Sequence, residues 1–435
     1  MLINFKTKNY KSFKNGFDFT MKPSRVRDLN HSLLYYNEGE NTKKILSSSV
    51  IYGPNAAGKT TIIEAFSRIK EIVLNGNIEN PKINRYNMNS VNLELTPFIY
   101  NSEKEPVEFD ITFEMDKVIY RYFLSIELGN FLSKDGREIL EEILEINSKN
   151  IYIRENKKIN VFFENMKDIY LNEGFSRNLL ESYDLIMNSN LESTKLFLST
   201  EFRSLISKEL YNNIYKWFDE KLLVFNNFYQ FSSVLELEKN EYKQVPKELY
   251  EAVNKIGVLA TDMFFRKTDE NEIPVLYSVL QFNNNKVLIP SRMIESVGTL
   301  HFIDLFPLIM LSLQEGITLV IDEMDASLHP MVVMSVVNLF HNPNINKNNA
   351  QLIFNTHNPI YLNNSVFRRD EMCFVEKDKD TRISDFYKLS DFMTNSGTST
   401  RNTTDYINNY FKNKYGAIEY VDLSEIFDIP KNGEE

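Results

Sequence analysis

Cysteine is almost absent from this chain, because Cys373 is the only one among 435 residues. A single cysteine allows no intrachain disulfide, and such a composition fits a reducing compartment. No charged and then apolar leader opens the sequence, which argues against secretion. We therefore expect a cytoplasmic protein.

Long hydrophobic runs are missing too. The longest apolar stretch, LHFIDLFPLIML, is interrupted by Asp304 and Pro307 and is shorter than the roughly 20 residues that span a bilayer. We therefore expect no membrane partner.

Positive charge is in deficit, with a formal net charge of −11 at pH 7. That total argues against a protein coated by nucleic acid, although it leaves room for a local basic patch. One run near the start does gather Lys6, Lys8, Lys11 and Lys14. This run is either a solvated rim or an edge that faces a nucleotide or another polyanion.

Glycine is also scarce, with 14 residues in the chain, so a short stretch bounded by two glycines stands out. GPNAAGKT fits the pattern G-x-x-x-x-G-K-[ST], with a strand-like run before it and a helical pattern after it. Glycines at the first and sixth positions let successive N–H groups face one concavity, toward which the helix directs its positive end. The pattern predicts a phosphate-binding loop made of Gly53, Pro54, Asn55, Ala56, Ala57, Gly58, Lys59, Thr60 and Thr61.

Four side chains would supply the chemistry around a bound nucleotide. We expect Lys59 to reach the β- and γ-phosphates and the Thr60 hydroxyl to join the shell of a Mg²⁺ ion. The apolar run 317–321 ends in Asp322 and Glu323, and a buried strand presents such acids at its carboxyl end, where open α/β sheets bind ligands. There Asp322 would hold Mg²⁺ through water, and Glu323 would orient or deprotonate the attacking water.

Other polar groups are candidates for the same site. Ser296 and Gly298 open a helix of about 18 residues, so Ser296 is either a helix cap or a phosphate contact. His357 ends the apolar run in AQLIFNTHNP, where a histidine can hydrogen-bond a γ-phosphate and the attacking water. Between these strands, MDASLHP supplies turn and helix-cap residues or further site residues.

Secondary-structure patterns divide the chain into four parts. Strand-like runs around one helix fill residues 1–160, and NLELTPFIY, VEFDITFEM and VIYRYFLSIEL among them are typical of an antiparallel meander. Helical patterns follow over 161–270, and strands alternate with helices over 271–420, as in a parallel sheet covered by helices. We predict the α/β class, with a helical insertion between two lobes and a loose tail over 421–435.

The order GPNAAGKT, ESVGT, VIDEMDASLHP and FNTHNP resembles a P-loop ABC-type ATPase head. The chain is similar to chromosome-maintenance ATPases such as SMC and RecF. It is more similar to the compact bacterial AAA-family ATPases of phage defence that include RloA and the ATPase subunit of the PARIS system. The resemblance covers residues 1–160 and 270–420 and is weak across the insertion. It implies a head that binds ATP and Mg²⁺, with a mixed sheet and an antiparallel β subdomain.

The resemblance also implies roles and an assembly. In such heads two subunits pack head to tail, and the signature of one caps the γ-phosphate held by the other, so a homodimer or higher homo-oligomer is expected. The resemblance makes Lys59 and Thr60 the Walker A ligands and Ser296 and Gly298 the signature. It makes Asp322 and Glu323 the Walker B pair. Asp325 becomes the D-loop acid and His357 the switch histidine.

Two departures from the family pattern matter. The signature has S-V-G-T where transporters usually have S-G-G-Q, which argues against a transporter subunit. The first Gln in the chain is Gln230, so the N-terminal lobe has none to form a Q-loop. The segment around Thr96, Pro97 and Phe98 is our candidate for its replacement.

Two functions stay open. The resemblance favours an ATP-hydrolysing switch whose dimer controls an effector, a nuclease or toxin, in phage defence, with DNA or a phage protein as the trigger. The alternative is a RecF- or SMC-like ATPase of DNA repair or maintenance, which needs a continuous basic surface. No nuclease or toxin constellation is visible in the chain. We interpret His31 and His301 as structural and Arg368, Arg369 and Asp370 as a surface loop.

Overall fold

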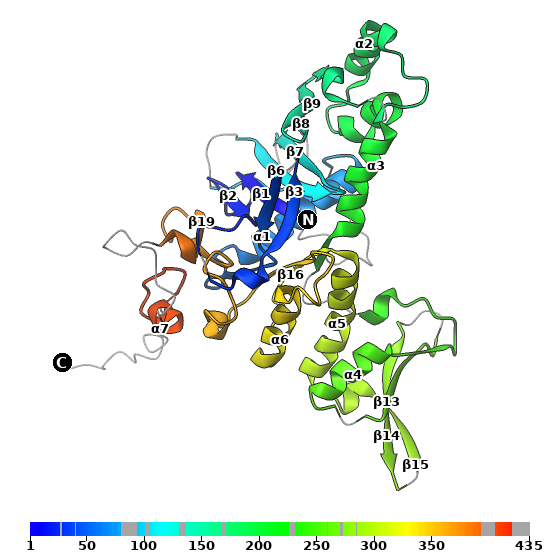
Figure 1. The fold of residues 1–435 in the computed structure, drawn as a ribbon, viewed down its shortest axis with the longest axis vertical. Helices are drawn as coiled ribbons and strands as arrows, with labels where there is room; N and C mark the ends of the chain where they lie inside the picture. The colour runs from blue at the N-terminus through cyan, green and yellow to red at the C-terminus, as the bar shows by residue number, and fades with distance from the viewer. Residues whose placement is uncertain are drawn as a thin grey trace, which may run out of the picture.

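The structure is a computed structural model. It describes residues 1–26, 28–39, 41–79, 94–100, 105–129, 136–167, 170–225, 231–258, 260–269, 273–283, 285–392 and 405–419. Their strands form a six-stranded, a seven-stranded, a four-stranded and a two-stranded sheet (Figure 1). The predicted tail, 421–435, lies outside the described residues.

The six-stranded sheet carries the phosphate loop. Its order is β11-β16-β17-β5-β18-β19, and its neighbours run parallel except β18 and β19. Ile51 packs into one hydrophobic core and Val50 and Tyr52 into another, so both faces of β5 are buried, as expected for a central parallel strand. The strands are β5 (Ser48–Tyr52), β11 (Leu222–Phe225), β16 (Thr318–Ile321), β17 (Gln351–Asn355), β18 (Met372–Lys377) and β19 (Ser384–Lys388).

The seven-stranded sheet is antiparallel, with the order β10-β9-β8-β7-β6-β1-β2. It covers the helix that follows the phosphate loop, and Phe5 meets Phe66 of that helix with ring centroids 4.4 Å apart. Its strands are β1 (Leu2–Lys8), β2 (Phe17–Thr20), β6 (Val107–Met115), β7 (Val118–Glu127), β8 (Glu138–Ile146), β9 (Lys149–Glu155) and β10 (Lys158–Val161). The α/β class, with a mixed sheet and an antiparallel subdomain, is confirmed.

One predicted strand of the meander is wrong. The described part of NLELTPFIY, residues 94–100, forms no strand. Its backbone instead lies along the turn between β1 and β2, where the Lys11 N–H donates to the Thr96 carbonyl at 3.0 Å. Pro97 lacks an N–H group and cannot contribute to a continuous strand ladder there.

Helices cover both faces of the parallel sheet. In Figure 1, α1 lies beside β1 and β3, whereas α5 and α6 lie beyond β16. The α-helices of the described residues are α1 (Lys59–Asn75), α2 (Leu180–Asn190), α3 (Lys208–Lys216), α4 (Lys247–Lys255), α5 (Val297–Glu315), α6 (Pro330–His341) and α7 (Tyr406–Phe411).

The predicted helical insertion, 161–270, proves to be mixed. It holds α2, α3 and α4, but β11 follows α3 and pairs in parallel with β16. A four-stranded antiparallel sheet also begins within it, at the end of the molecule opposite α2 (Figure 1). That sheet contains β12 (Tyr242–Gln244), β13 (Asp262–Arg266), β14 (Val275–Phe282) and β15 (Asn285–Pro290), and the remaining pair is β3 (Leu34–Glu38) with β4 (Asn41–Ile45).

Among the described helices, α5 alone is long and apolar enough to cross a membrane by length and composition. It contacts α4 and β16, and its residues Phe302, Ile303 and Ile309 belong to one of the two cores. We therefore interpret α5 as a core helix. Its start lies near the end of β16.

Candidate functional site

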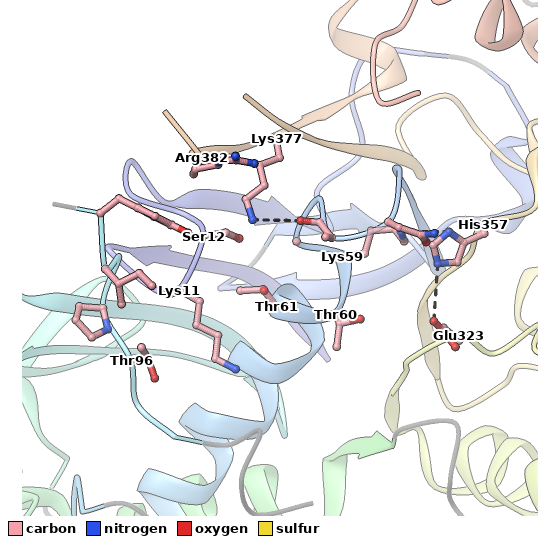
Figure 2. A pocket seen from close by; sticks show the side chains of 16 residues that line it. Lys11, Ser12, Lys59, Thr60, Thr61, Thr96, Glu323, His357, Lys377 and Arg382 are labelled. Carbon is pink, nitrogen blue, oxygen red and sulfur yellow. Dashed lines mark hydrogen bonds and ion pairs between the residues drawn. The ribbon is translucent and has the colours of Figure 1, made fainter. Parts of the chain in front are cut away.

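The carboxyl ends of β5, β17 and β16 form one side of a cavity. Because β17 lies between β5 and β16, the loop after β5 comes close to the residues that follow the other two strands. The cavity measures about 490 Å³, and Lys59, Thr60, Glu323 and His357 line it together (Figure 2). The structure thus brings these four predicted residues to one place.

The Lys59 side chain folds back over the phosphate loop. Its Nζ donates to the carbonyls of Gly53 at 2.8 Å and Pro54 at 2.9 Å, and it lies 3.4 Å from His357 Nδ1. Burial lowers the pKa of Lys59 to about 8, against the opposing effect of Glu323 and Asp322. A phosphate would replace the two carbonyls as the partner of this ammonium group.

Other chain segments approach the phosphate loop so closely at two positions that a side chain there would clash. A Cβ on Gly53 would lie 2.4 Å from the carbonyl oxygen of Val375 in β18. Gly58 has φ +119°, and a Cβ there would lie 2.9 Å from Ser12 Oγ. The glycine pattern of the loop therefore reflects packing as well as turning.

Thr60 and Asp322 offer the oxygen atoms expected for Mg²⁺. Thr60 Oγ1 donates to Asp322 Oδ1 at 3.2 Å. Burial raises the pKa of Asp322, and the hydrogen bonds from Asn355 and Thr60 oppose that rise. In the described part of the chain no three His, Cys, Asp or Glu side chains gather to hold a metal by themselves. A hydroxyl and a carboxylate fit Mg²⁺ when phosphate oxygens and water complete its shell.

Glu323 and His357 face each other at the end of the cavity. Glu323 Oε1 lies 3.8 Å from His357 Nε2, and both side chains are partly exposed, at 39% and 45% (Figure 2). Burial, helped by the charge of Lys59, lowers the pKa of His357, whereas Glu323, Asp325 and Asp322 raise it. The net shift favours the neutral imidazole, which can accept or donate a hydrogen bond.

Two residues after and within β17 were not assigned a role from the sequence. Asn355 accepts from the Glu323 N–H and donates to Asp322, both at 2.5 Å. Thr356 Oγ1 donates to Asp325 Oδ2 at 2.6 Å. The strand-end rule that identified His357 also applies to these neighbours, so their position was a usable signal.

Ser296 and Gly298 are not among the described residues that line this cavity. Ser296 caps α5, with its Oγ accepting from the Thr299 N–H at 3.1 Å, and it does not line the cavity. A Cβ on Gly298 would lie 2.3 Å from the carbonyl oxygen of Ser327, so the start of α5 touches the connection after β16. Asp325 lines a neighbouring hollow with Glu323 and His357.

The lysine run near the N-terminus was expected to be either a solvated rim or an edge that faces a nucleotide, and its members differ in this respect. Lys6 pairs with Asp18 at 2.8 Å and Lys8 with Glu108 at 3.9 Å, both as exposed side chains. Lys11 lines the cavity and pairs with Glu64 at 2.6 Å. Of the candidate Q-loop replacements, Thr96 and Pro97 line the cavity and Phe98 is buried.

The interpretation of Arg368, Arg369 and Asp370 as a surface loop is wrong, because all three are buried. Arg368 donates to both carboxylate oxygens of Asp370, at 2.9 and 3.0 Å, and Asp370 also accepts from the Ser24 N–H. Arg369 pairs with Asp28 at 2.7 Å. These ion pairs and hydrogen bonds connect the segment after β2 to the C-terminal lobe.

A phosphate loop follows the central parallel strand β5, and acids end β16, which is separated from β5 by one strand. This arrangement defines a P-loop nucleotide-binding protein. The chain belongs to the family described as "AAA domain, putative AbiEii toxin, Type IV TA system", whose model matches residues 48–363. Membership in this AAA-type ATPase family implies ATP binding, and the description links the family to toxin–antitoxin systems.

Comparison with solved structures finds an SMC head domain from Thermotoga maritima. It is 15% identical, with 89% of this chain and 98% of that chain covered and a TM-score of 0.34. No curated protein matches the chain.

Proposed function

We propose that this protein is a cytoplasmic ATP-hydrolysing switch of the compact group that includes RloA and the PARIS ATPase. Its ATP-bound dimer would control a partner effector, a nuclease or toxin, in bacterial defence against phage. The observation that carries the proposal is the convergence of Lys59, Thr60, Asp322, Glu323 and His357 on neighbouring strand ends. The toxin–antitoxin link in the family description supports the choice of an effector as partner.

In this proposal each side chain acts on ATP or water. Lys59 contacts the β- and γ-phosphates, and Glu323 orients the attacking water and accepts its proton. The neutral His357 hydrogen-bonds the γ-phosphate beside that water. Mg²⁺, held through Thr60 and Asp322, would supply charge neutralisation on the phosphates.

The position of Ser296 supports the proposed dimer. Ser296 is exposed and lies outside the cavity that holds Lys59, so it is open to a phosphate held by a second copy. The close approach of Gly298 to Ser327 would couple that contact to the connection that bears Asp325. The DNA-maintenance alternative needs a basic surface, and the pairing of Lys6, Lys8 and Lys11 with carboxylates gives it no support.

The test is phosphate release from Mg·ATP by the purified chain. Glu323→Gln should lower the rate at least a hundredfold while ATP still binds, because the base is lost and the phosphate contacts remain. Glu220→Gln makes the same substitution at an exposed surface position and should hydrolyse ATP like the wild type. Wild-type turnover in Glu323→Gln would refute the proposed mechanism.

A further inference from the structure

The β18–β19 hairpin supports the phosphate loop along its length. Val375 faces Gly53, the Lys377 Nζ donates to the Ala56 carbonyl at 3.2 Å, and Ser384 Oγ donates to the Ala57 carbonyl at 2.5 Å. Segments more than 300 residues apart in sequence thus form one unit (Figure 2). The hairpin is therefore a wall of the nucleotide cavity.

This wall brings two cations to the cavity. Lys377 is half-buried, Arg382 is exposed, and both line the cavity. Across the described ranges of the chain neither forms an ion pair, whereas Lys11 on the facing wall pairs with Glu64. The lining has four Lys and Arg side chains, with Glu323 as its one carboxylate among the described residues. Such an excess of positive charge fits a polyanion.

The turn between the strands holds Arg382 in place. Asp378 Oδ1 accepts from the Asp380 N–H at 3.1 Å and from the Thr381 N–H and hydroxyl at 2.7 Å. These bonds lower the pKa of Asp378. The Arg382 N–H donates to the Asp378 carbonyl at 3.0 Å, and Arg382 has φ +61°. The turn is thus ordered by its own side chains before any ligand arrives.

An unsatisfied hydroxyl lies close to this wall. Ser12 Oγ is buried and has no hydrogen-bond partner among the described residues, although Ser12 lines the cavity. It lies near Gly58, and the Ser12 carbonyl accepts from the Ser384 N–H at 2.8 Å. A buried hydroxyl without a partner is costly, so a ligand acceptor at this position would stabilise it.

We propose that Lys377 and Arg382 form a second phosphate contact, which binds the polyphosphate of a nucleoside triphosphate from the β18–β19 wall of the cavity. The inference rests on the proposed function, because it takes this cavity as the ATP site. A guanidinium presents a planar fork to phosphate oxygens, and an ammonium adds charge to the same face. The hairpin would therefore contribute to ATP affinity from outside the Walker motifs.

The test compares binding of Mg·ATP and of magnesium tripolyphosphate, which lacks base and ribose, by calorimetry on the full chain at low salt. Arg382→Ala and Lys377→Ala should each raise the Kd for both probes at least tenfold. Arg382→Lys should fall between them and the wild type. Lys379→Ala alters an exposed cation of the same turn that pairs with Glu419, and it should stay within twofold of the wild type. Thermal melting checks that each variant is folded.

Three results would overturn the inference. If folded Arg382→Ala bound both probes with wild-type affinity, Arg382 would make no contact with the polyphosphate. Weaker ATP binding with unchanged tripolyphosphate binding would move the contact to the ribose or base. If the wild type bound neither probe, the proposed function would be refuted together with this inference. The first two results would refute this inference alone.

Discussion

Asn355 holds Asp322 by a side-chain hydrogen bond, with Nδ2 donating to Asp322 Oδ1 at 2.5 Å across adjacent strand ends. The Oδ1 of the same carboxamide accepts from the Glu323 N–H at 2.5 Å. Glu323 has φ +49°, which is uncommon for a residue with a side chain. One carboxamide therefore fixes the directions of both acids.

Asn355→Ala should lower kcat for ATP hydrolysis at least tenfold and change the Kd for Mg·ATP by less than threefold. It removes two hydrogen bonds, each worth about 1 kcal/mol, and frees the acids without touching the phosphate loop. Asn344→Ala, at an exposed loop position, is the matched control. Single-turnover rates and calorimetry would measure the two quantities. Loss of ATP affinity with unchanged kcat would assign Asn355 a different role.

The affinity for ATP should depend on the protonation of Lys59. The pKa of this group is lowered to about 8 by burial, and bound phosphates favour its charged form. Binding is therefore accompanied by proton uptake above pH 8, so the Kd should be constant near pH 7 and rise up to about tenfold per pH unit above pH 8. Lys59→Arg stays charged and should bind more weakly but with no such slope. A flat wild-type profile from pH 7 to 9.5 would contradict the account.

Gly298→Ala should impair hydrolysis while ATP still binds. The new Cβ would lie 2.3 Å from the backbone oxygen of Ser327, and backbone cannot move aside as a flexible side chain can. The connection that bears Asp325 must shift, so we expect kcat to fall at least tenfold with the Kd within twofold. Leu311→Ala, at a 43% exposed position of the same helix, should behave as the wild type. Normal turnover in Gly298→Ala would show that this contact is not needed.

Asp304 should make stability depend on pH. Burial raises its pKa to about 6, although the Phe231 N–H donates to it at 2.8 Å. The native state holds this proton more tightly than the unfolded chain, so the stabilisation is complete below about pH 4 and is lost as pH rises through 6. Asp304→Asn should raise the free energy of unfolding by about 1 to 2 kcal/mol at pH 8 and change it little at pH 4.

Urea unfolding at both pH values would measure this difference. Asp184→Asn, at an exposed position of α2, should leave the free energy of unfolding unchanged at either pH. An equal effect of Asp304→Asn at pH 4 and pH 8 would mean that Asp304 does not titrate in the expected range.

Much of the site could be predicted because local patterns determine it. A glycine-bounded loop after an apolar strand placed Lys59, and the rule that parallel strands end at one edge placed Glu323 and His357. Lys377 and Arg382 could not be predicted in this way. They occur in the charged run EKDKDTRIS, and only the hairpin's contact with the phosphate loop brings them to the cavity.

The errors have related causes. LLVF reads as the end of the preceding helix, yet it pairs with β16 as β11, and that pairing is not visible in the sequence. A charged run such as Arg368–Asp370 usually lies at the surface, but here its members satisfy one another and the segment after β2. Contacts between distant segments override local preference in both cases.

The most direct test of the central claim is the solution mass of Glu323→Gln with and without Mg·ATP, by light scattering after gel filtration. We expect a smaller species without nucleotide and a dimer or larger assembly with it, because a site that binds but does not hydrolyse ATP should accumulate the closed state. Adding Ser296→Arg to Glu323→Gln should abolish the increase, since Ser296 would face the phosphate of the second copy. An unchanged mass with ATP demonstrably bound would contradict the claim that ATP drives assembly.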